Sequence, residues 1–189
     1  MKKSAKILLS ILSLVLVVSL SVGGTMAYLQ ARSDSVTNTF TFGNIQVALE
    51  ESTGGTYKVI PGVDIGKDPT VIVSNLPGYE NVDAFVYVKV EEQNWPTGTT
   101  AAGSRKLGYE IADGWTPLSG VPGVYYREVK ADASVKSFPV LKDNKVTVSG
   151  ELTKAELAQH SSAKLIFTAY AVQKDGMSSA KDAWTKAGF

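Results

Sequence analysis

The sequence of 189 residues contains no cysteine and a single histidine, His160. The absence of cysteine excludes disulfide bonds, thiol catalysis, iron–sulfur clusters and cysteine-ligated zinc. A single histidine limits any serine triad to one base, and the chain has no Gly-x-Ser-x-Gly motif. The fold must therefore be held by its core and by strand pairing, and the sequence predicts no catalytic residue.

The sequence also lacks an excess of charge of either sign. It has 19 Lys and Arg against 18 Asp and Glu, interspersed along the chain, with no basic stripe for a nucleic acid. Neither a glycine-rich phosphate loop nor the ligand spacing of an EF-hand is present. We therefore expect no cofactor and no nucleic-acid partner.

Only one long apolar run is present, at residues 7–22, and it follows three lysines. A basic start, a short apolar segment and small residues before a cleavage point are typical of a secretory signal peptide. A membrane-spanning helix needs about 20 apolar residues, so an uncleaved anchor is the less favoured alternative. The pattern predicts cleavage between Ala27 and Tyr28 and a secreted chain of one domain.

The first segment after that point has the two-residue period of a strand. Val36, Asn38, Phe40 and Phe42 share one side, and threonines occupy the other. Such an uncharged, proline-free strand at a free end can pair in its own sheet or add to the open edge of a neighbour. Addition to a neighbour is head-to-tail and propagates into a fibre, whereas pairing within the chain has the lower entropy cost.

The rest of the chain consists of short periodic segments between turn residues, which is typical of an all-β antiparallel sandwich. A loop is expected at 95–104, a tight hairpin at 142–144, and short capped helices near the C-terminus at 153–160 and 179–187. The predicted strands are residues 44–51, 57–60, 70–73, 82–92, 107–111, 115–118, 124–129, 135–141, 145–148 and 163–173. In 82–92, the first half has apolar residues on both faces and the second half on one.

Glu156 and His160 are the weak candidates for a metal site, because a spacing of four places both on one helix face. Catalytic zinc needs three protein ligands, and the chain has no His-Glu-x-x-His. The favoured interpretation is structural: Glu156 completes a capping box and His160 lies near a helix C-terminus. No metal site is predicted.

Several aromatic residues fall within predicted strands, where they could form either a sugar-binding platform or part of the core. The core is favoured, since aromatic residues in strands usually pack there or pair across strands. These residues are Trp115, Tyr125, Tyr126, Phe138, Phe167 and Tyr170.

Several motifs at the junction of signal and strand, and farther along the chain, resemble those of one family. They are Gly23-Gly24-Thr25-Met26-Ala27-Tyr28, Asn38-Thr39-Phe40-Thr41-Phe42-Gly43-Asn44-Ile45, Val47-Ala48-Leu49-Glu50, Ile60-Pro61-Gly62, Lys67-Asp68-Pro69, Val86-Tyr87-Val88-Lys89-Val90, Gly114-Trp115, Tyr125-Tyr126, Ala169-Tyr170-Ala171-Val172-Gln173 and Ala183-Trp184. With these motifs the chain resembles the TasA/camelysin family of exported Gram-positive proteins. The likeness extends over nearly the whole chain, and its later motifs are looser than those at the junction of signal and strand.

The resemblance implies a jelly-roll-type sandwich that serves as a structural subunit of the extracellular, biofilm matrix. It implies export through a SipW-type signal peptidase, and assembly with itself into fibres by donation of the segment from Tyr28 to about Phe42. It also names other matrix proteins as further partners. The expected divisions are a signal peptide at 1–27, an N-terminal extended segment at 28–43 and a β-sandwich domain at 44–189.

Two other functions stay open at this point. Camelysin-like relatives carry a metalloprotease label, so one rival is a secreted metal-dependent protease that uses Glu156 and His160. The other is a monomeric cell-surface binding module that uses an exposed Trp95 or Trp115.

Overall fold

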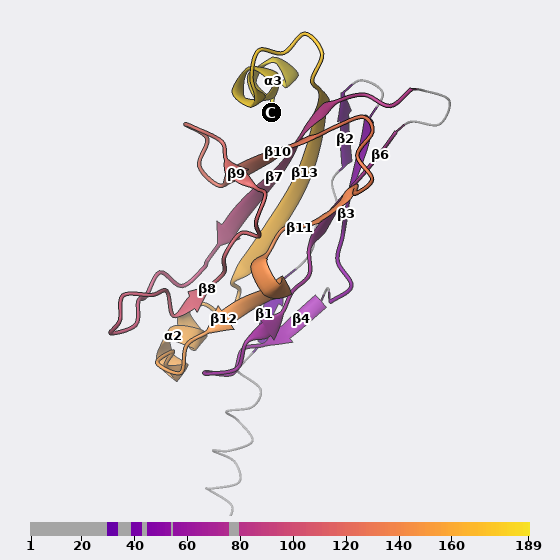
Figure 1. Ribbon diagram of the computed structural model, residues 1–189. Helices are drawn as coiled ribbons and strands as arrows, with labels where there is room; N and C mark the ends of the chain where they lie inside the picture. The colour runs from indigo at the N-terminus through magenta and orange to yellow at the C-terminus, as the bar shows by residue number, and fades with distance from the viewer. Residues whose placement is uncertain (1–29, 34–38, 43–44, 54, 76–79) are drawn as a thin grey trace, which may run out of the picture.

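The computed structural model describes residues 30–33, 39–42, 45–53, 55–75 and 80–189. The elements in these ranges are strands and three short helical segments (Figure 1). The strands are β1 Gln30–Ser33, β2 Thr39–Phe42, β3 Ile45–Glu50, β4 Gly55–Lys58, β5 Ile65–Gly66, β6 Thr70–Asn75, β7 Ala84–Gln93, β8 Leu107–Gly108, β9 Thr116–Pro117, β10 Val124–Val129, β11 Ser137–Pro139, β12 Lys145–Val148 and β13 Lys164–Gln173. The helical segments are the 3-10 turn η1 Lys142–Asn144, and the helices α2 Lys154–Gln159 and α3 Ala180–Ala187.

The largest sheet has five strands in the order β2-β13-β7-β10-β9. At its centre β13 and β7 run antiparallel along the full ten residues of each strand (Figure 1). Val86 and Val88 of β7 face one core, and Phe85 and Tyr87 face another on the opposite side. The predicted burial of the first half of this strand on both faces is therefore confirmed.

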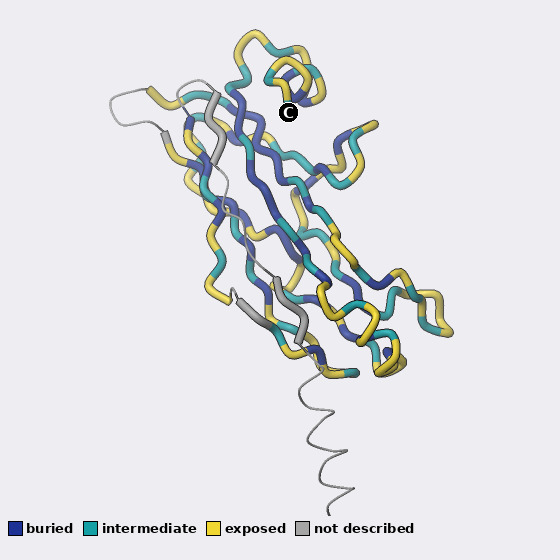
Figure 2. Tube along the Cα trace, turned by 180° about the vertical axis from the view of Figure 1, so that it is seen from behind, coloured by how far each residue is buried: buried dark blue, intermediate teal, exposed yellow. Residues whose placement is uncertain are grey.

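A second layer faces this sheet and consists of two three-stranded sheets, β11-β6-β3 and β5-β12-β8. In β3 the alternating residues Ile45, Val47 and Leu49 are buried, because they point toward the first layer. They pack with Val86, Val88 and other buried residues into the main core. Figure 2 shows the buried stretches of the chain in dark blue along the strands. Two layers of antiparallel strands around one core confirm the predicted all-β sandwich.

The outer face of the five-stranded sheet is covered at one end by α3 (Figure 1). Ser179 caps this helix by accepting a hydrogen bond from the backbone N–H of Asp182 at 3.1 Å. Trp184 points onto the sheet, and together with seven other buried residues it forms a second cluster, the C-terminal core. The members of this core are Phe85, Tyr87, Leu118, Val124, Val172, Ala180, Ala183 and Trp184.

Two features differ from the sequence-based expectations. The turn at 142–144 does not join a hairpin, because β11 pairs with β6, whereas β12 pairs with β5 and β8. The predicted hairpin was wrong because a tight turn between two strands does not determine which partner each strand takes. The second departure is β2, which joins the antiparallel sheet as a parallel strand.

Among the residues that the structure describes, no helix has both the length and the apolar character needed to cross a bilayer. The predicted signal peptide at 1–27 lies outside the described residues, as do the cleavage pair Ala27 and Tyr28 and the segment residues Val36 and Asn38.

Candidate functional site

The end of the predicted donor segment lies at one edge of the five-stranded sheet. There β2 pairs with β13 in parallel, with Thr39 opposite Ala169 and Phe42 opposite Val172. Among the described strands, β2 is the terminal one in this sheet, with β13 as its neighbour on one side and no described strand on the other. The sequence left pairing within the chain and donation to a neighbour as alternatives. In this single chain the strand pairs with β13 of its own chain.

The receiving strand β13 is otherwise fully occupied. Its opposite edge pairs with β7 along its whole length. Ala169 and Ala171 are fully buried against the main core, and Val172 is buried in the C-terminal core. The edge at residues 169–172 is therefore completed by a strand from the start of the chain, and removal of that strand would leave a row of backbone donors and acceptors without strand partners.

The N-terminal segment makes a second contact farther back, where β1 pairs antiparallel with β4. Gln30 lies opposite Lys58, and Ala31 lies opposite Tyr57. Each of the two pairings, β1 with β4 and β2 with β13, involves only four residues. The N-terminal segment is thus held by two short pairings, one with β4 and one with β13.

A buried ion pair holds β4 against the body of the domain. Lys67 Nζ lies 2.7 Å from Glu51 Oε1, and each side chain is 3% exposed. The hydroxyl of Tyr57 in β4 donates a hydrogen bond of 2.8 Å to the same carboxylate. Burial is the main cause that raises the pKa of Tyr57 to about 12. The Lys67 ammonium also lies 5.2 Å from the centre of the Tyr57 ring and 5.4 Å from that of Phe167, which are cation–π distances.

The next residue, Asp68, points the other way and fixes the turn between β3 and β4. Its carboxylate accepts hydrogen bonds from the backbone N–H and the hydroxyl groups of both Ser52 and Thr53. The hydrogen bonds from these two side chains are the main cause that lowers the pKa of Asp68 to about 2. Lys67 and Asp68 lie between β5 and β6. Through Glu51, Ser52 and Thr53 they form a clamp that joins this segment to the β3–β4 turn. The sequence showed these residues as part of a motif, but nothing in the sequence indicated their partners.

The weak metal candidates have structural partners instead. Glu156 Oε2 accepts a hydrogen bond from the backbone N–H of Thr153 at 2.8 Å, which confirms the predicted capping box. Glu156 Oε1 also lies 2.8 Å from Lys106 Nζ, and this contact is the main cause that lowers the pKa of Glu156 to about 2. His160 Nδ1 lies 2.8 Å from the carbonyl oxygen of Asn94. In the described part of the chain, no three His, Cys, Asp or Glu residues are grouped as metal ligands.

The tryptophans of the rival binding module are not exposed platforms. Trp115 is 8% exposed, and its indole N–H donates to the Pro139 carbonyl at 2.9 Å. Trp95 is partly buried, and its indole N–H donates to the Leu107 carbonyl at 3.0 Å. The exposed Trp115 of the rival function is therefore wrong. The favoured core position is confirmed, because this side chain belongs to the main core, as do Phe138 and Phe167.

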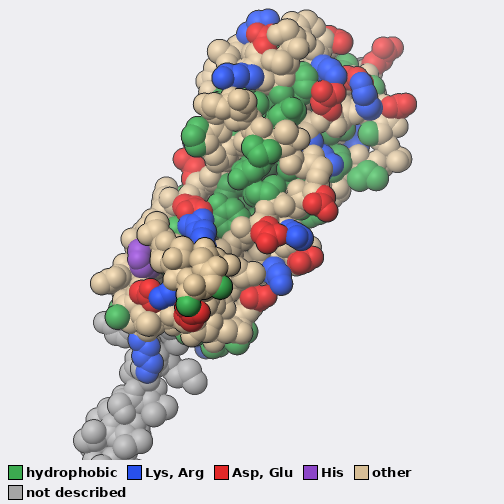
Figure 3. All heavy atoms as spheres, turned by 60° about the vertical axis from the view of Figure 1, so that its left-hand side comes forward, with side chains coloured by type: hydrophobic (Ala, Val, Ile, Leu, Met, Phe, Trp, Pro, Cys, Tyr) green, Lys and Arg blue, Asp and Glu red, His purple; other side chains and the backbone are tan. Residues whose placement is uncertain are grey.

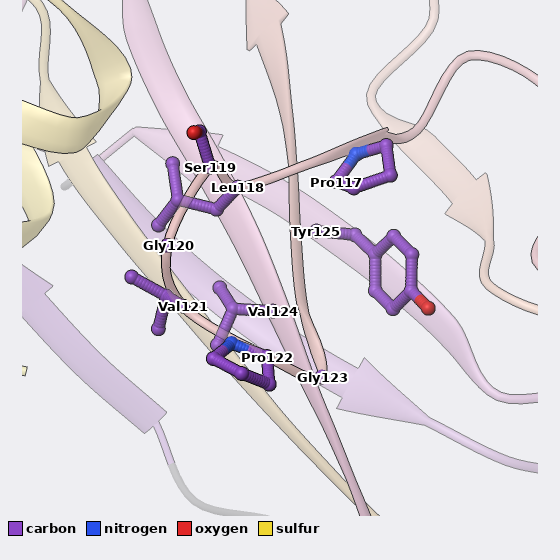
Figure 4. Close-up of a pocket in the computed structure, with 9 residues that line it drawn as sticks. All are labelled: Pro117, Leu118, Ser119, Gly120, Val121, Pro122, Gly123, Val124 and Tyr125. Carbon is purple, nitrogen blue, oxygen red and sulfur yellow. The ribbon is translucent and has the colours of Figure 1, made fainter.

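An open hollow of about 290 Å³ lies in the β9–β10 turn (Figure 4). This turn is at the edge of the five-stranded sheet opposite to the edge formed by β2. Its walls include Pro117, Leu118, Pro122 and Tyr125. Figure 3 shows hydrophobic side chains gathered along this flank of the molecule, between the two ends. No Asp, Glu, Lys, Arg or His lines the hollow, so it offers no acid–base pair for catalysis.

No family model, no curated protein and no solved structure matches the chain. The β2–β13 edge is therefore the candidate functional site.

Proposed function

We propose that this protein is a secreted structural subunit of an extracellular matrix, and that it assembles head-to-tail into fibres by strand exchange. The observation that supports strand exchange is that β2, in the N-terminal part of the chain, completes the sheet edge through only four paired residues. In the fibre, each copy donates residues 28–42 to the next copy, and Thr39–Phe42 of this segment take the β2 position there. Each copy gives one strand and receives one from a different copy, so the contact is head-to-tail, need not close on itself and can propagate into a fibre.

Pairing within one chain and pairing between copies involve the same two strands, β2 and β13. A strand from another copy makes the same contacts with β13 as the strand of the same chain, so the enthalpy of pairing is nearly equal. Pairing within the chain has the advantage of a tether, since only two residues separate β2 from β3. Such a tether corresponds to an effective concentration on the order of millimolar. Exchange is therefore favoured at high local concentration, as in a matrix, or by a partner that opens the first chain.

Two features of the sequence support the extracellular setting. The basic start and the apolar run at residues 7–22 fit an export signal that ends at Ala27. The resemblance to the TasA/camelysin family adds processing by a SipW-type signal peptidase and a biofilm matrix as the site of action. On this proposal the partners are further copies of the chain and other matrix proteins.

The proposal is tested on the purified chain that begins at Tyr28. Negative-stain electron microscopy should show fibres with a regular subunit repeat, and size-exclusion chromatography should show assembly that increases with concentration. A chain without residues 28–42 should form no fibres, although it retains the receiving edge. Fibres of unchanged appearance from the shortened chain would contradict strand exchange, and a persistent monomer of the Tyr28 chain at millimolar concentration would contradict self-assembly.

A further inference from the structure

Three aromatic rings form a cluster beside the edge that receives β2. Tyr170 of β13, Trp184 of α3 and the final residue Phe189 contact one another, with ring centres 5.1 Å apart for Tyr170 and Trp184, 4.6 Å for Tyr170 and Phe189, and 5.4 Å for Trp184 and Phe189. Trp184 is buried, whereas Tyr170 and Phe189 are partly exposed. Two of the three rings thus come from the C-terminal end of the chain.

The cluster is held in place by contacts of its own. Tyr87 is fully buried beneath Trp184, with ring centres 5.1 Å apart, and its hydroxyl donates to the carbonyl of Ala180 at 2.7 Å. Gly188 ends α3 with a positive φ of 78°, which turns the chain so that the N–H of Phe189 reaches the Trp184 carbonyl at 3.4 Å. The last residue is therefore placed over the sheet by the helix cap.

The strand register relates the cluster to the incoming strand. Tyr170 lies opposite position 40 of β2, and Val172 lies opposite position 42. Tyr170 and Val172 face the C-terminal core, whereas Ala169 and Ala171 face the main core. Paired residues of neighbouring strands share a face of the sheet, so positions 40 and 42 of any strand at this edge belong to the face that carries the cluster.

We propose that Tyr170, Trp184 and Phe189 form the docking cluster that selects an aromatic residue at position 40 of a strand donated by a second copy of this chain. This inference rests on the proposed strand exchange and adds to it the element that recognises the partner. The sequence of the strand, Thr39-Phe40-Thr41-Phe42, supplies the aromatic residue at that position. Aromatic pairs add specific ring contacts to the area that they bury, so the cluster discriminates against strands without a ring there.

The test uses two single variants with defects on opposite sides of the contact. Phe40→Ala weakens the strand that is given, and Phe189→Ala weakens the cluster that receives it. Each change weakens the ring contact within the closed chain and between copies alike, so each variant alone should assemble at about the same concentration as the wild-type chain. Lys186→Ala is the matched control, because Lys186 is an exposed residue of α3, and it should assemble as the wild type does.

The decisive measurement is a mixture of the two variants, analysed by size-exclusion chromatography with light scattering. The Phe189→Ala chain has an intact strand to give, and the Phe40→Ala chain has an intact cluster to receive it. At a concentration where neither assembles alone, the mixture should therefore give dimers of one copy of each, with no longer species. A mixture that contains no more dimer than its components would overturn the inference.

Hydrogen exchange on the monomer separates this inference from the proposed function. In the single chain the same cluster lies beside β2, so Phe189→Ala should increase amide exchange at residues 39–42 about tenfold, while Lys186→Ala should leave it unchanged. If the wild-type chain never assembles, strand exchange is wrong, and an unchanged exchange rate in Phe189→Ala shows separately that the cluster does not hold the strand.

Discussion

Lys67 illustrates how one residue decides the geometry of the N-terminal contact. Its ammonium and the carboxylate of Glu51 are almost fully removed from solvent, and Tyr57 connects the pair to β4. The cavity beside them measures only about 20 Å³, which is room for about one water molecule. Because solvent cannot replace either partner, the position of β4 depends on both charges being present.

We expect Glu51→Gln to lower the free energy of unfolding by about 3 kcal/mol or more, because it leaves the buried ammonium of Lys67 without the carboxylate of Glu51. The double variant Glu51→Leu with Lys67→Met should regain most of the loss, since an apolar pair of similar size removes both charges. Glu110→Gln is the matched control in an exposed pair with Lys142 and should cost far less, because solvent screens exposed charges. Urea unfolding measures all three, and equal losses at Glu51 and Glu110 would contradict the buried clamp.

Asp68 makes the stability of the folded domain depend on pH in the acid range. Its pKa is lowered from 3.8 to about 2 in the folded protein by the hydroxyl groups of Ser52 and Thr53. A carboxylate with a lowered pKa stabilises the folded state above its unfolded pKa, and this contribution is lost as the pH falls through the folded value. Asp68→Asn should therefore be less stable than the wild type at pH 7, and the difference should shrink between about pH 4 and pH 2. Chemical unfolding across this range measures it, and a difference that does not change with pH would contradict the assignment.

The sequence predicted some of these residue-level features and missed others for a physical reason. The capping box of Thr153 and Glu156 is local, since both hydrogen bonds are made within four residues of sequence, and the pattern alone was sufficient. The clamp is not local, because Lys67 meets Glu51 across 16 residues and is buried only after three separate strands have come together. Lysine is rarely buried, so no sequence pattern predicted a lysine at this place in the core.

At the scale of elements, periodicity located strands better than it located their partners. β10 and β12 begin and end at the predicted residues, and β13 differs by one residue at its start. The predicted hairpin at 142–144 was wrong because pairing is decided by the whole sheet and not by the turn. β5, with two residues, is too short to produce a periodic signal. The parallel direction of β2 was also unpredicted, since a strand pattern has no direction.

The position of α3 depends on its N-cap, so Ser179→Ala should lower the free energy of unfolding by about 1 kcal/mol. The Ser179 hydroxyl accepts a hydrogen bond from the backbone N–H of Asp182, and without it this N–H loses its partner at the start of the helix that carries Trp184. Ser134→Ala, at an exposed loop serine, is the control and should be near neutral. Thermal and urea unfolding compare the two variants, and equal stability would show that the cap contributes nothing to the docking of α3.

At the scale of the whole molecule, the start of the chain and its C-terminal end meet at one sheet edge. β2 is tethered to the second layer through β3, but its ladder is with β13, about 130 positions later in the chain. The edge and its aromatic cover are therefore complete only when a strand from an N-terminal segment is present. Either the same chain or another copy can supply that strand, and a crosslink across the ladder distinguishes the two.

Cysteines at positions 41 and 171 provide this crosslink, because Thr41 lies opposite Ala171 and the chain has no other cysteine. Paired residues of neighbouring strands are about 4.8 Å apart, within the range that a disulfide spans. Oxidation of Thr41→Cys with Ala171→Cys in dilute solution should give a monomer with an internal bond, and this locked monomer should form no fibres until it is reduced. Oxidation after assembly should instead link neighbouring copies into a ladder on a non-reducing gel. Fibres that contain only internal bonds would show that the copies associate without exchanging strands.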